Sequence, residues 1–152
     1  MDTLQWLGQM SMGLPMALGA IGSAVGIAIA GQSAAGAWAK EAKADKSLSF
    51  TYIILSGMPI SQIIYAYIFT LSLVEAINSA TDLSSKAGAF FGLALACGIA
   101  ELVSACFQGK VGGAACRALS EGDGKGFTFM IIVMGIVETV GLFGFVLLLG
   151  FL

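Results

Sequence analysis

The sequence predicts an all-α membrane protein whose four transmembrane helices form two duplicated hairpins. Only 11% of the 152 residues are charged and 58% are hydrophobic, whereas a soluble domain has about 25% charged residues. Four apolar segments are each long enough for a bilayer core, which needs about 20 residues per helix. The two halves of the chain also share residue types at matching positions. These segments leave no room for a separate soluble domain.

The first hairpin is defined by two uncharged stretches. No Asp, Glu, Lys or Arg occurs in 3–39 or in 47–74, and each stretch exceeds the spanning length. We therefore expect the first hairpin at 1–80, with helices at 11–38 and 50–77.

The second hairpin is expected at 81–152, with helices at 87–117 and 127–151. Its helices are apolar but carry charged groups inside them. Glu101 and Lys110 fall in the third helix, and Glu138 falls near the middle of the fourth. We expect this hairpin to carry the essential carboxylate.

An internal repeat relates the two hairpins. Three residues of the first helix recur with the same types and spacing in the third, and three positions of the second helix are matched in the fourth by a glycine and two aromatic residues. The first set is Gly22, Gln32 and Gly36, matched by Gly98, Gln108 and Gly112; the second is Gly57, Tyr65 and Tyr67, matched by Gly135, Phe143 and Phe145. Duplication of an even number of spans keeps both copies in the same orientation.

The distribution of cations predicts the orientation. Six of the seven lie in or near the first and third connections, 39–49 and 118–126, namely Lys40, Lys43, Lys46, Lys110, Arg117 and Lys125. Because cytoplasmic loops carry the excess of Lys and Arg, these loops should be cytoplasmic and both termini external. Each loop is either a simple solvated connection or a docking surface for a cytoplasmic partner.

Composition also excludes several classes of function. A net charge of −2 gives no basic surface for nucleic acid. The chain has no His, which removes the commonest catalytic base and most zinc sites. The three cysteines lie in apolar sequence and are interpreted as small hydrophobic residues.

Small residues form stripes on the first and third predicted helices. They recur at three- and four-residue spacing, as at Gly19, Gly22, Ser23, Gly26 and Ala30, and at Ala94, Gly98, Ala105 and Gly112. Such stripes let helices approach closely in lipid. They predict either packing inside one four-helix bundle or the inner layer of an oligomeric ring with the bulkier helices outside.

Glu138 is the leading candidate functional residue. A carboxylate at bilayer depth costs at least about 2.5–3.5 kcal/mol, so it should be neutral, paired or bound to a cation. The corresponding residue of the first hairpin is Ile60, so only the second repeat has the acid. The first hairpin contributes other oxygen donors at the same depth.

Those donors surround Pro59 on the second helix. Pro59 removes a backbone donor and frees a carbonyl near Leu55, so that local backbone oxygens can turn toward a ligand. Ser61, Gln62 and Tyr65 follow within about one turn. Tyr65 is interpreted as a lid that donates its hydroxyl to the carboxylate, or as an interface aromatic residue.

Gln108 on the third helix completes the donor set. One carboxylate, one hydroxyl, two amide oxygens and a carbonyl suit a hard monovalent cation such as Na⁺. Ca²⁺ and Mg²⁺ would need more carboxylates or retained waters. A site for protons alone would not need the amides.

The sequence resembles the duplicated rotor proteolipid, or K subunit, of V-type and A/V-type rotary ATPases. The resemblance covers nearly the whole chain. It is carried by Gln108-Gly109-Lys110-Val111, Val137-Glu138-Thr139 and Pro59-Ile60-Ser61-Gln62 with Tyr65. It implies that Na⁺ is held by Glu138, Gln108, Gln62, Ser61 and the backbone carbonyl of Met58, with Tyr65 supporting Glu138.

The same resemblance implies the partners. Identical subunits form a ring that turns in the membrane against a stator subunit, whose Arg displaces the ion. The central stalk of the complex contacts loops 39–49 and 118–126, and the setting is the plasma membrane of a prokaryote. The K subunit is then not an enzyme by itself and needs no bound cofactor beyond the transported ion.

Three alternatives remain open at this point. A ring of the same kind could transport H⁺ instead of Na⁺, a small four-helix transporter could couple export to protons through Glu138, and a purely structural subunit would leave the polar cluster unexplained. Glu101 departs from the family pattern. We expect it to be protonated or paired within the bundle.

Overall fold

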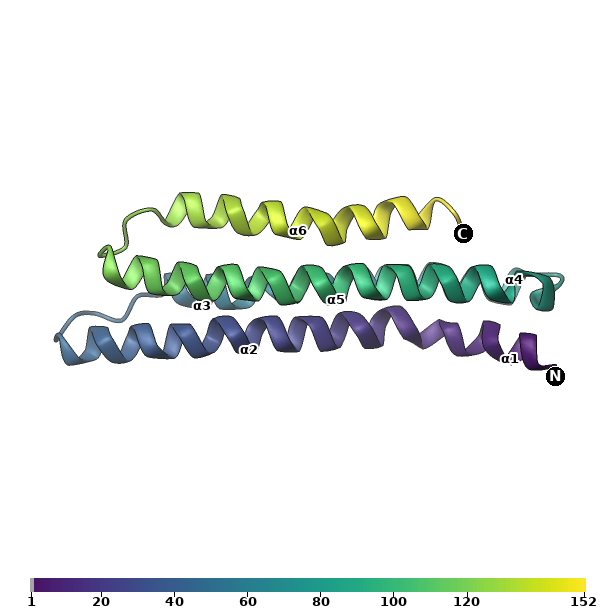
Figure 1. The fold of residues 1–152 in the computed structure, drawn as a ribbon, viewed down its shortest axis with the longest axis horizontal. Helices are drawn as coiled ribbons and strands as arrows, with labels where there is room; N and C mark the ends of the chain where they lie inside the picture. Colours follow the sequence, from purple (N-terminus) through teal and green to yellow (C-terminus); the bar gives the residue numbers. More distant parts are fainter. Residues whose placement is uncertain (1) are drawn as a thin grey trace.

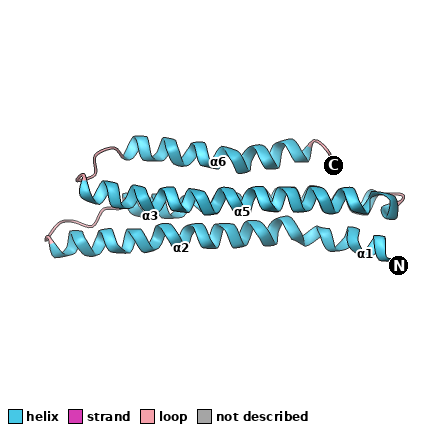
Figure 2. Ribbon diagram, in the orientation of Figure 1, coloured by secondary structure: helices cyan, strands magenta, loops and turns pink. Residues whose placement is uncertain are grey.

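The computed structural model describes residues 2–152, and every regular element in that range is helical (Figure 2). In chain order the elements are α1 (Thr3–Met10), the 3₁₀ turn η1 (Ser11–Gly13), α2 (Leu14–Lys43), α3 (Thr51–Gly57), the 3₁₀ turn η2 (Met58–Ile60), α4 (Ser61–Ser79), α5 (Leu83–Glu121) and α6 (Phe127–Leu149). They combine into four segments long and apolar enough to cross a membrane. The predicted all-α class with four spans is confirmed.

The segments run side by side along one axis (Figure 1). Both termini and the short α4–α5 connection lie at one end of the bundle. The α2–α3 and α5–α6 connections lie together at the other end. Five of the seven cations lie in these two connections or within five residues of them, namely Lys40, Lys43, Lys46, Arg117 and Lys125, so most of the positive charge is at this end.

The first and third segments extend beyond the ranges predicted from charge. The first is helical from Thr3, where the Asp2 carboxylate accepts a hydrogen bond of 2.7 Å from the backbone N–H of Gln5, to Lys43. The third, α5, begins after the N-cap Asp82 and is about 58 Å long, against about 30 Å for a bilayer core. The Asp2 and Asp82 carboxylates cap the N-termini of these two segments. The segments continue through Lys40, Lys43 and Lys86, because a charged side chain outside the membrane does not interrupt a helix.

Helices α2 and α5 approach each other closely at their glycines. A Cβ atom at Gly109 would lie 2.2 Å from the carbonyl oxygen of Gly26, and one at Gly22 would lie 2.5 Å from the Cα of Leu102. Backbone contact of this kind gives dispersion contacts that larger residues would prevent. Within one chain, the small-residue stripes therefore pack the first span against the third.

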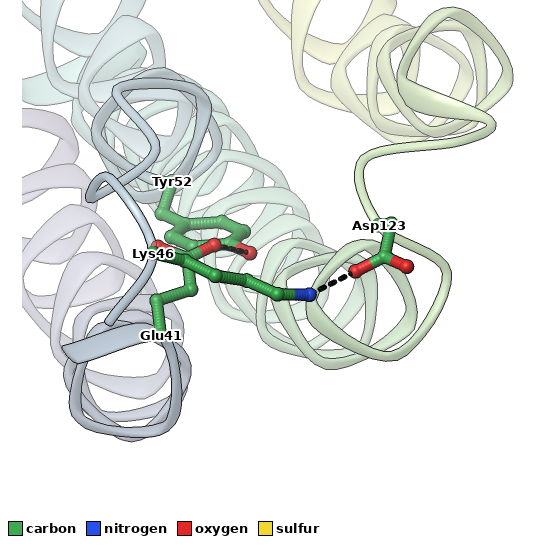
Figure 3. Close-up of polar contacts among 4 residues, drawn as sticks. All are labelled: Glu41, Lys46, Tyr52 and Asp123. Carbon is green, nitrogen blue, oxygen red and sulfur yellow. Dashed lines mark hydrogen bonds and ion pairs between the residues drawn. The ribbon is translucent and has the colours of Figure 1, made fainter. Parts of the chain in front are cut away.

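The two loops at the cation-rich end are joined by an ion pair (Figure 3). The Lys46 ammonium lies 2.5 Å from a carboxylate oxygen of Asp123. Nearby, Glu41 accepts a hydrogen bond from the Tyr52 hydroxyl at 2.6 Å. It accepts a second from the backbone N–H of Ser49 at 2.9 Å. The hydrogen bond and the opposite charge raise the pKa of Lys46 and lower the pKa of Asp123.

Candidate ion-binding site

The carboxylate of Glu138 is held from two other helices. Glu138 lies on α6 and is partly buried. The Tyr65 hydroxyl on α4 donates to Oε1 at 2.9 Å, and the Gln108 amide on α5 donates to Oε2 at 3.1 Å. Three spans thus meet at one carboxyl group near the middle of α6.

Tyr65 is positioned by stacking as well as by its hydrogen bond. Its ring lies parallel to that of Phe145, with centroids 5.9 Å apart and an interplanar angle of 8°. Phe145 is on α6, about two turns after Glu138. The stack fixes the ring, and the ring directs the hydroxyl to the carboxylate.

Pro59 breaks the second span immediately before the polar residues. It lies in η2, between α3 and α4. At the start of α4, the Ser61 hydroxyl is 3.1 Å from the Met58 carbonyl oxygen and 3.2 Å from Oε1 of Gln62. The Met58 carbonyl oxygen and the Gln62 amide oxygen therefore both lie beside the Ser61 hydroxyl.

The carbonyl of Leu55, one turn before Pro59, lies against α5. A Cβ atom at Gly112 of α5 would lie 2.8 Å from that oxygen. The carbonyl freed by the proline thus packs against a neighbouring backbone. The Met58 carbonyl is the one that lies beside Ser61.

Gln62 and Gln108 are fully buried and hydrogen-bonded to each other. The Gln62 amide nitrogen is 3.1 Å from Oε1 of Gln108. It also donates at 3.1 Å to Ser104, whose hydroxyl donates to the Val137 carbonyl at 3.0 Å. In this arrangement the Gln108 oxygen faces Gln62, so ligation of a cation by that oxygen requires the amide to turn over.

Ser104 is the member of the network that sequence reasoning missed. It lies on α5 one turn before Gln108 and connects α4 to α6. The four-residue spacing from Gln108 was the available signal, because residues so spaced share a helix face. A serine on a small-residue stripe is nevertheless hard to distinguish from a packing residue.

Glu101 lies outside this hydrogen-bond network. It is on α5 and fully buried, and neither of its carboxyl oxygens has a hydrogen-bond partner in the described part of the chain. The sequence led us to expect Glu101 to be either protonated or paired within the bundle. A pairing partner is not observed among the described residues of a single copy of the chain.

Two stretches of the chain, 10–73 and 91–150, match the family model described as the ATP synthase C subunit. One match falls on each hairpin, in agreement with the internal repeat. Together they cover most of the chain. No curated protein matches the chain.

Proposed function

The chain belongs to the ATP synthase C subunit family, and on that premise we propose that it is the K-type rotor subunit of a V-type or A/V-type ATPase that transports Na⁺. Membership of this family directly supports an ion-carrying role in a membrane ring. Proteins of this family are non-catalytic, ion-carrying members of a homo-oligomeric membrane ring. The proposal adds the ion, the residues that hold it and the subtype of the complex.

The donor set around Glu138 supports Na⁺ as the ion. We assign Glu138 as the carrier, with ligands from the Ser61 hydroxyl, the Gln62 and Gln108 amide oxygens and the Met58 carbonyl. These are hard oxygen donors with a single negative charge, as a monovalent hard cation prefers. Tyr65 holds the carboxylate in place. The observation that best supports this assignment is that Tyr65 and Gln108, on two other spans, both donate hydrogen bonds to Glu138.

The distribution of the acid between the two hairpins supports the V-type subtype. Both hairpins match the family, but Ile60 occupies the repeat position of Glu138. One chain of four spans therefore provides one carrier, as in the duplicated proteolipids that the sequence resembles. Loops 39–49 and 118–126, which hold four of the seven cations, would then face the cytoplasm and the central stalk, with both termini external.

Carbodiimide labelling of the intact ring tests the choice of ion. We expect the reagent to modify Glu138, and Na⁺ at neutral pH to protect it, with the modified residue identified by mass spectrometry. K⁺ at the same ionic strength is the control and should protect much less. If Na⁺ gives no protection and labelling responds only to acid pH, the transported ion is H⁺.

The Glu138→Gln substitution tests the carrier itself. Gln has nearly the same shape and can still accept the hydrogen bond from Tyr65, so we expect the ring to assemble. It has no charge to balance a cation, so transport should be abolished. Transport near the wild-type rate in an assembled Glu138→Gln ring would exclude Glu138, and particles without a ring in detergent would favour a small transporter.

A further inference from the structure

Glu101 is a second membrane-embedded acid that the proposed ion site does not use. Its side chain is 0% exposed, and both of its oxygens lack hydrogen-bond partners among residues 2–152. It lies two helical turns, about 10 Å along α5, from Gln108. It makes no hydrogen bond to any proposed ligand.

The space around Glu101 is formed by the α5–α6 contact. A Cβ atom at Gly141 would lie 2.7 Å from Oε2 of Glu101 and 3.0 Å from the Ser104 hydroxyl. Gly141 is one turn after Glu138 on α6. The absence of a side chain at Gly141 therefore makes room for a carboxyl group next to the ion site.

Among residues 2–152, no Lys or Arg forms an ion pair with Glu101. The titratable groups close enough to interact with it are Glu138 on α6, Tyr65 on α4 and Cys97 on α5. The first span contributes none, since 3–26 contains no titratable side chain. The one ion pair in the described residues is at the distant loops. An ionised carboxylate that is buried, unpaired and near a second acid is strongly disfavoured.

We propose that Glu101 is a second proton-binding site, which keeps its proton while Glu138 binds and releases the transported ion. The proposal rests on the proposed function for the exchange at Glu138. Its consequence is that two neighbouring carboxyl groups together carry one negative charge. Two ionised carboxylates would instead favour a divalent cation, so the retained proton limits the site to a single monovalent ion.

Infrared spectroscopy of the purified ring tests the proposal directly, because the carbonyl stretch of a protonated acid is separate from the bands of a carboxylate. In the Na⁺-saturated wild-type ring we expect an acid band. Glu101→Gln should lose that band, and Glu138→Gln should retain it. If Glu101→Gln does not assemble, Glu101→Asp keeps an acid and should shift the band.

Na⁺ protection of Glu138 in the Glu101→Gln ring gives a second readout. Gln resembles the protonated acid, so the midpoint of protection should stay at its wild-type value. Removal of an ionised Glu101 would weaken Na⁺ binding by more than about tenfold. That weakening, the absence of an acid band in the wild type, or a band unchanged in Glu101→Gln would each overturn the proposal.

The two proposals fail in different ways. If Na⁺ gives no protection but the Glu101 band is present in Glu138→Gln, only the choice of ion is wrong. If Na⁺ protects Glu138 but substitution at Glu101 leaves every acid band in place, only the retained proton is wrong.

Discussion

Replacement of Tyr65 by Phe removes only the hydroxyl that donates to Glu138 at 2.9 Å. The ring stack on Phe145 is retained, so the fold should be unaffected. A hydrogen bond to a charged group contributes about 1.5–3 kcal/mol. Because Tyr65 and Glu138 are both only partly buried, we expect the lower end of that range, or about tenfold weaker Na⁺ binding.

The assay is the Na⁺ concentration that half-protects Glu138 from carbodiimide in the assembled ring. Tyr67→Phe is the matched control, since Tyr67 is two residues away and 46% exposed. Its midpoint should equal that of the wild type. If Tyr65→Phe also leaves the midpoint unchanged, the hydroxyl does not position the carboxylate for the ion.

Two further predictions concern the fold. Gly109→Ala should destabilise the protein by about 1–3 kcal/mol, because its Cβ would meet the α2 backbone. Thermal unfolding measures this loss, and the control Gly31→Ala should not lower the stability, because nothing lies within 4 Å of a Cβ at Gly31. The pKa of Asp123 lies below its ordinary 3.8 because Lys46 donates to it, so the loop pairing should be present at neutral pH and lost as the pH falls through that lowered value. Amide hydrogen exchange in 44–50, corrected for its intrinsic pH dependence, should then accelerate in acid. Lys46→Gln should accelerate it already at neutral pH. If protection in 44–50 is the same at acid and neutral pH and in Lys46→Gln, the pairing is contradicted.

The fold class was predictable because the bilayer imposes simple rules. Backbone groups in lipid must be satisfied internally, so a long uncharged segment can only be a helix there. The 3–39 and 47–74 stretches met this condition without any tertiary information. Helix ends were less predictable, since α5 runs from Leu83 to Glu121, four residues beyond each end of the predicted 87–117.

The candidate site was predictable only as a set of residue types at similar depth. Glu138 stood out because it is the one charged residue in 127–149, and Pro59 drew attention to the residues that follow it. Which atom faces which partner depends on the rotation of each helix about its axis, and periodicity alone does not fix that rotation. Ser104 was missed for this reason.

The sequence by itself determined the number of spans, their duplication and the one carboxylate near the middle of the fourth helix, because charge is costly in lipid wherever the helices lie. Only the tertiary structure decided that Glu138 is held by Tyr65 and Gln108, and that Glu101 has no hydrogen-bond partner among residues 2–152. Those contacts depend on the close approach of α2 to α5 and of α5 to α6, and therefore on glycines whose role emerges only when two backbones meet.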